Sequence, residues 1–161
     1  MNDNQHQETE SPPGITSTAN IAGHPIHPAL IPFPIAFLTG TLLSDIAYWQ
    51  TGDAFWARAS LWLVGAGLVA GLLAAAFGAT DYFTIARARE HTAGKIHFIG
   101  NLTAIILAAI NLFIRWGDPA GPILWWGLIL SLVTAAILGV TGWYGGELAY
   151  RHKIGVAGHE G

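Results

Sequence analysis

The stretch LWLVGAGLVAGLLAAAFGA, residues 61–79, decides the fold class because it contains no charged side chain. A helix needs about 20 mainly apolar residues to cross the hydrocarbon core of a bilayer. Working outward, similar apolar segments predict four spans, at about residues 30–48, 59–80, 96–114 and 123–144. One such run could be a buried helix of a soluble protein, but four in 161 residues predict an integral membrane protein.

The composition supports the same class. Hydrophobic residues make up 52% of the chain and charged residues only 11%, against about 25% in soluble domains. With a net charge of −3, these values exclude a disordered chain, a nucleic-acid binder and an ordinary soluble globule. The chain has no cysteine, which excludes disulfides, iron–sulfur clusters, cysteine zinc sites and covalently attached haem.

Short connections between the spans predict an all-α, integral membrane four-helix bundle with up-down-up-down order. We expect a disordered polar N-terminal tail over residues 1–22, the helical domain over 23–156 and a C-terminal tail over 157–161. Gly67 and Gly71 form a GxxxG pattern that lets helices approach closely. Such a unit could also form a homodimer.

The basic residues predict the orientation in the bilayer. The side that holds both termini and the middle loop carries five of them: Arg87, Arg89, Lys95, Arg151 and Lys153. The other side carries Arg58 and Arg115. By the positive-inside rule, both termini are expected in the cytoplasm of a cell whose inner membrane holds the protein.

Two histidines precede the first span, in the segment GHPIHPALIPFP. His24 and His27 each stand before a proline, which favours extended or polyproline geometry. Three residues make one polyproline turn of about 9 Å, so the two imidazoles would point the same way but lie too far apart for one metal. We therefore expect the two histidines to have separate roles, such as one metal ligand and one interfacial hydrogen bond. The alternative is a rigid entry segment whose histidines face the lipid headgroups.

His97 is the preferred site residue. It lies near the start of the third span, and Asn101 follows one turn later on the same face. Polar residues in a membrane helix are expected to face the bundle interior. Asp81 and Asn101 are candidates to orient an imidazole, and Tyr150 and Arg151 to contact haem propionates or lipid headgroups.

Asp45 is the acidic residue of the first span, where a charged side chain is energetically unfavourable. A carboxylate in the membrane needs a partner, and Asp45 lies toward the end that holds Arg58 and Arg115. We predict a structural ion pair of Asp45 with one of these two arginines.

The segments FGATDYF, HFIGNL and GWYGGELAYRHKIGV, together with the HPxHP segment, resemble a known group. The chain is similar, over about residues 22–156, to the bacterial predicted-membrane-protein family catalogued as domain of unknown function 2231. The matching positions are His24, His27, Asp45, Asp81, His97, Asn101, Gly145, Gly146, Tyr150 and His152. Some members of this family are joined to redox domains such as Rieske-type modules, so the resemblance implies an association with electron transfer. It implies no known activity.

Two functions stay open. The first is a non-catalytic scaffold or a module that handles a small solute or metal ion. The second is a b-type haem protein in electron transfer, with a redox protein as its partner and with axial ligands among His24, His27 and His97. The expected position of the histidines near the membrane surface argues against haem. The chain has no Ser–His–Asp signature, phosphate loop or HExxH motif, so an enzyme is the less favoured interpretation.

Overall fold

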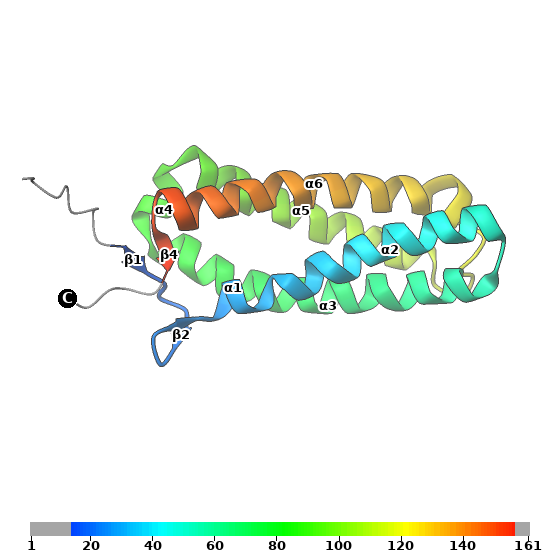
Figure 1. The fold of residues 1–161 in the computed structure, drawn as a ribbon, viewed down its shortest axis with the longest axis horizontal. Coiled ribbons are helices and arrows are strands. Elements are labelled where there is room, and N and C mark those ends of the chain that lie inside the picture. Colours follow the sequence, from blue (N-terminus) through cyan, green and yellow to red (C-terminus); the bar gives the residue numbers. More distant parts are fainter. Residues whose placement is uncertain (1–13, 157–161) are drawn as a thin grey trace, which may run out of the picture.

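The computed structural model describes residues 14–156, and Figure 1 shows a long bundle of helices with short strands at one end. The helices are α1 (Ile26–Leu30), α2 (Pro32–Thr51), α3 (Ala54–Thr84), α4 (Ala86–Glu90), α5 (Thr92–Ile114) and α6 (Leu128–Gly146). Two π-helical turns, Ile123–Gly127 and Glu147–Arg151, flank α6. The strands are β1 (Ile15–Thr16), β2 (Asn20–Ile21), β3 (His24–Pro25) and β4 (Ile154–Val156).

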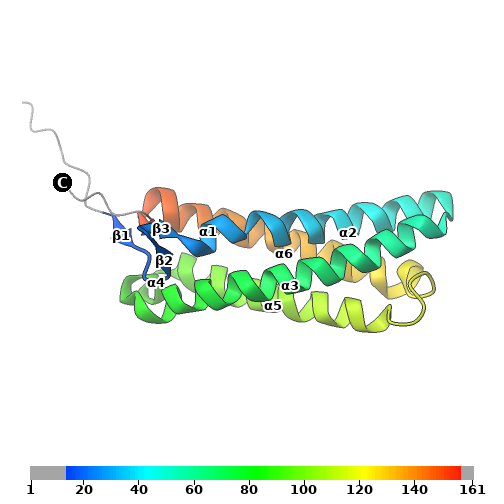
Figure 2. The same cartoon turned by 90° about the horizontal axis from the view of Figure 1, so that it is seen from below.

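Four helical segments of the described residues are long and apolar enough to cross a membrane. They cover Ile26–Thr51, Ala54–Thr84, Thr92–Ile114 and Ile123–Arg151. In Figures 1 and 2 they lie side by side along the long axis, as an all-α membrane bundle requires. Contacts join α2 to α3, α3 to α5, α5 to α6 and α6 to α2, so α2 and α5 occupy opposite corners.

The helices extend beyond the expected ranges at several ends. Pro32 stands at the start of α2, where a missing N–H costs little, so the proline-rich entry continues into helix. Gly52 ends α2 in the left-handed region, with φ 67°. Asp53 then caps α3 by accepting a hydrogen bond from the Phe55 N–H at 2.8 Å. A two-residue connection is therefore enough to reverse the chain.

The GxxxG pattern is used inside the chain. Gly67 and Gly71 are buried, and a Cβ added to Gly67 would lie 2.6 Å from Cδ2 of Leu38 on α2. Leu38 packs with Val64 and Ala108, which come from α3 and α5. These small residues let the helices approach within one chain, so the pattern carries no argument for a dimer.

The outer surface is apolar, and tryptophans gather at the end opposite the strands. Exposed tryptophans of this end are Trp49, Trp62, Trp116, Trp125 and Trp126. Tryptophan is enriched where a membrane protein meets the interface between lipid and water. The surface is thus suited to a lipid bilayer, as the composition predicts.

Residues 14–25 cross the other end of the bundle as a strap. β1 pairs with β4 in parallel, and β2 pairs with β3 in antiparallel orientation. Ser17 is buried, and the Asp81 carboxylate accepts hydrogen bonds from its hydroxyl and from the backbone N–H groups of Thr18 and Ala19. Part of the segment expected as a polar tail is therefore ordered, because Asp81 satisfies its donors. The rest of both expected tails, residues 1–13 and 157–161, lies outside the described residues.

The strap should depend on Asp81. In the variant Asp81→Ala, the N–H groups of Thr18 and Ala19 lose their acceptor, so we expect their hydrogen exchange to become at least tenfold faster, by loss of a charge-assisted bond. Exchange in the middle of α3 serves as the control and should not change. Unchanged exchange at Thr18 and Ala19 would show that the strap is held by other contacts.

Candidate functional site

Two histidines from different helices enter the bundle interior near the strap. His27 lies on α1, and its Nδ1 is 2.8 Å from the backbone oxygen of Ala74 on α3. His97 lies on α5, and its Nδ1 is 2.8 Å from the backbone oxygen of Thr141 on α6. A carbonyl oxygen only accepts, so each Nδ1 carries the proton and donates it. In the neutral ring this leaves the lone pair on Nε2, the state in which imidazole binds a metal.

The two rings approach each other. Their centroids are 6.0 Å apart, and their planes are nearly perpendicular, at 86°. Two imidazoles that bind one metal from opposite sides, through bonds of about 2 Å, have centroids roughly 6 Å apart. The separation of His27 and His97 therefore suits two ligands on opposite sides of one metal.

Glycines make room for both rings. A Cβ added to Gly78 would lie 2.8 Å from Nδ1 and Cε1 of His27, and one added to Gly145 would lie 2.7 Å from Cε1 of His97. Any side chain at either position would displace the ring from its carbonyl partner. Gly78 and Gly145 thus allow each imidazole to lie directly against the backbone of the neighbouring helix.

The contact of His27 lies well away from the ends of α3. Ala74, the partner of His27, is five residues from the middle of α3, which is about 8 Å along the helix axis. His27 therefore contacts a carbonyl well inside α3, because the chain turns helical at Ile26 and directs the side chain inward.

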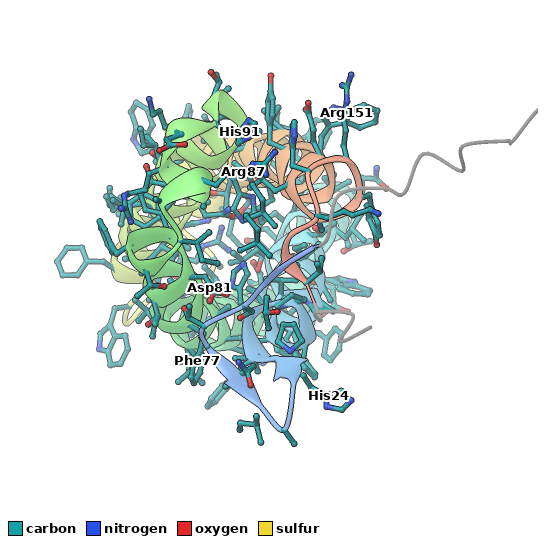
Figure 3. All side chains as sticks on the ribbon, turned by 90° about the vertical axis from the view of Figure 1, so that its left-hand side faces the viewer. His24, Phe77, Asp81, Arg87, His91 and Arg151 are labelled. Atoms are coloured by element: carbon teal, nitrogen blue, oxygen red, sulfur yellow. The ribbon has the colours of Figure 1, made fainter. Side chains whose placement is uncertain are left out.

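The HPxHP segment does not form the expected polyproline turn. His24 begins β3, directly after the turn of the β2–β3 hairpin, and is exposed, with its Nδ1 2.9 Å from the backbone oxygen of Ala22. Figure 3 shows its side chain pointing away from the bundle. His27 follows on a helix instead, so the two histidines have different surroundings.

Asn101 and Asp81 contact groups other than the imidazole rings. The Asn101 side-chain amide donates to the backbone oxygen of His97 at 2.7 Å, and its Oδ1 accepts from the hydroxyl of Thr141 at 3.3 Å. Asn101 therefore supports the backbone that carries both His97 and its partner carbonyl. Asp81 holds the strap, as described above, and lies beneath it in Figure 3.

Tyr150 and Arg151 lie at the outer rim of this end. The Tyr150 side chain is exposed, and Arg151 reaches Glu147 at 3.5 Å while remaining mostly in solvent. Figure 3 shows Arg151 at the edge of the bundle. Both residues are thus placed to meet lipid headgroups or solvent.

A second histidine pair lies nearby, and sequence reasoning missed it. The rings of His91 and His152 are 4.2 Å apart and tilted by 34°, and His152 Nε2 is 3.7 Å from a Glu147 oxygen. The pair joins the start of α5 to the turn after α6. The spacing of 61 residues between them gave no signal of this contact.

The opposite end of the bundle holds a buried ionic cluster. Arg115 and Asp45 are both fully buried and form two hydrogen bonds of 2.7 Å. Asn111 and the hydroxyls of Ser60 and Ser131 complete the cluster, with Ser131 donating to Asp45 at 2.6 Å. Asp45 therefore pairs with Arg115, whereas Arg58, the other predicted candidate, is exposed. The serines were missed because serine is common in such helices.

Comparison with protein families identifies the group to which the chain is similar. The family model described as "Predicted membrane protein (DUF2231)" matches residues 23–158. Neither the curated proteins nor the solved structures contain a match.

The ionic cluster predicts a sharp difference between two arginines. In Arg115→Gln, Asp45 keeps a buried charge without its partner, so we expect the free energy of unfolding to fall by about 3–5 kcal/mol. The matched variant Arg58→Gln changes an exposed residue and should cost less than about 0.5 kcal/mol. Unfolding in detergent, followed by circular dichroism, gives both values. Equal effects of the two variants would contradict a structural role for the buried pair.

Proposed function

Since the chain belongs to the DUF2231 family of predicted membrane proteins, whose description leaves the activity open, we propose a function from its site: binding of b-type haem between His27 and His97. The single observation that carries the proposal is the pair of neighbouring imidazoles, with centroids 6.0 Å apart and with both Nδ1 atoms bonded to backbone carbonyls. The two Nε2 atoms, which these bonds leave unprotonated in the neutral rings, would hold the iron.

The number of ligands favours haem over a bare metal ion. Zinc, copper or nickel sites are usually built from three or four protein ligands. Over residues 14–156, no group of three His, Cys, Asp or Glu side chains could hold a metal ion. Haem brings four nitrogen ligands of its own and needs only one or two from the protein. Two histidines are therefore a complete ligand set for haem and an incomplete one for a bare ion.

The residues around the two rings are small. Ala74 and Ala104 are buried in the interior, and Gly78 and Gly145 lie beside the rings. Small residues of this kind let the two imidazoles lie between the helices, against their backbones. His27 and His97 would hold the iron, and haem, when bound, would supply one-electron chemistry. The carbonyl bonds from Ala74 and Thr141 would fix the orientation of each ring.

The position of the site links two halves of the bundle. The His27 bond joins α1 to α3, and the His97 bond joins α5 to α6. A metal between the rings would therefore connect the α1–α3 half to the α5–α6 half. We expect bound haem to raise the thermal unfolding midpoint, because a ligand that binds only the folded state stabilises it.

We further infer a place in a bacterial inner membrane, with the strap end on the cytoplasmic side and a redox protein as the electron partner. The distribution of basic residues supports this orientation. Five basic residues belong to the strap end. At the tryptophan end, Arg115 is buried in its ion pair with Asp45, so Arg58 is the exposed basic residue there.

Removal of either ligand should abolish haem binding. For the protein purified in detergent from cells with ample haem, we expect a sharp α band after reduction with dithionite. His27→Ala and His97→Ala should each lose most of the bound haem, while His24→Ala should keep it, because His24 is exposed and points away from the bundle. Iron and porphyrin content are measured alongside the spectrum.

Two outcomes would overturn this proposal. A featureless spectrum of well-folded protein would exclude haem as a resident cofactor. Full haem occupancy in His97→Ala, or equal loss in all three variants, would show that the pair of His27 and His97 is not the ligand set.

The glycines beside the rings provide a second prediction. Gly145→Ala places a Cβ 2.7 Å from the His97 ring, so the ring must move away and we expect at least a tenfold weaker affinity for haem. Gly139→Ala is the matched control on α6, because a Cβ there meets nothing within 4 Å. Titration of the apoprotein with haemin measures both. Equal affinities in the two variants would mean that close packing against Gly145 does not position His97.

A further inference from the structure

A long apolar groove lies on the outer surface of α2, α3 and α5. Its volume is about 900 Å³. Phe33 and Phe37 of α2, Trp62 and Val69 of α3, and Leu112 of α5 are among its lining residues, and no charged side chain lines it. Gly65, Ala66 and Ala70 leave the space free, because their side chains are too small to fill it.

The shape of the groove suits a hydrocarbon chain. Along α3 it extends from Leu61 to Leu73, which is about 18 Å at 1.5 Å per residue. One leaflet of the hydrocarbon core is about 15 Å thick. The groove offers no polar partner, so an occupant must carry none along this length.

A positive charge lies beyond one end of the groove. Arg58 precedes Trp62 by one helical turn on α3, on the face that continues through Gly65 and Val69. Arg58 is exposed, and Trp62 and Trp116 beside the groove mark the interfacial level. Among the described residues of this end, Arg115 is the other basic side chain and is fully buried with Asp45.

The exposed acidic residues of the same end accept hydrogen bonds within their own turns, and no described acidic residue forms an ion pair with Arg58. Asp53 accepts from the Phe55 N–H, and Asp118 accepts from the N–H groups of Ala120 and Gly121.

We propose that the groove binds an acyl chain of an anionic phospholipid, with the lipid phosphate at Arg58. This site is separate from the histidine pair and does not depend on haem.

Native mass spectrometry of the full chain in detergent tests this site, with phosphatidylglycerol and phosphatidylcholine of identical acyl chains as probes. Ala66→Phe fills the groove, and we expect it to lose the lipid adduct. Ala76→Phe makes the same change at an exposed position of α3 that does not line the groove, so the adduct should remain. Arg58→Gln should keep the adduct but lower the preference for phosphatidylglycerol about fivefold.

A second groove variant guards against misfolding. Val69 is 60% exposed, so Val69→Trp fills the groove without disturbing the interior, and it should behave like Ala66→Phe. Equal adducts in Val69→Trp and Ala76→Phe would overturn the proposal. It would also fail if the spectra show a dimer that Val69→Trp dissociates, or a bound isoprenoid quinone that both groove variants release.

Discussion

The ion pair of Asp45 and Arg115 is the interaction on which the bundle depends most. Neither charge is exposed, and a charge in the membrane interior needs a partner. The cluster takes Asp45 from α2, Ser60 from α3, Asn111 from α5 and Ser131 from α6. It thereby ties all four spans together at the tryptophan end, and separation of any helix there would leave a buried charge without its hydrogen bonds.

The strap end is built differently. His27 and His97 each bond the backbone of one neighbouring helix, so the protein supplies two cross-links within halves of the bundle rather than one network across it. The strap closes the end from outside through Asp81. The proposed haem would be the interior link at this end, in the place that the ionic cluster takes at the other. Charged side chains thus join the helices at one end, and hydrogen bonds from histidines to carbonyls join them at the other.

Much of the fold could be predicted because the membrane imposes simple constraints. Apolar length identified the spans, and the cost of a buried carboxylate indicated that Asp45 needs an arginine. The choice between Arg58 and Arg115 could not be made, because it depends on how far α5 extends and which face it turns inward. Likewise, the sequence singled out His97 but not its partner carbonyl at Thr141. Every residue has a backbone carbonyl, so the amino-acid sequence does not indicate which one accepts the bond.

The strap and the roles of the two proline-flanked histidines required three-dimensional information. Composition indicated a polar tail, but a single carboxylate, Asp81, orders residues 17–19. The helix that begins at Ile26 separates His24 from His27, although both precede a proline. At His24, in β3, the extended preference of a residue before proline is kept, whereas at His27 it gave way to the packing of α1 against α3.

The most direct test of the account is the electron paramagnetic resonance spectrum of the oxidised, haem-loaded protein at low temperature. The ring planes of His27 and His97 are nearly perpendicular. We therefore predict a low-spin ferric signal with the large principal g value that perpendicular axial imidazoles give. A high-spin signal, the signal of parallel imidazoles, or protein that takes up no haem would contradict the assignment of this pair as the ligands.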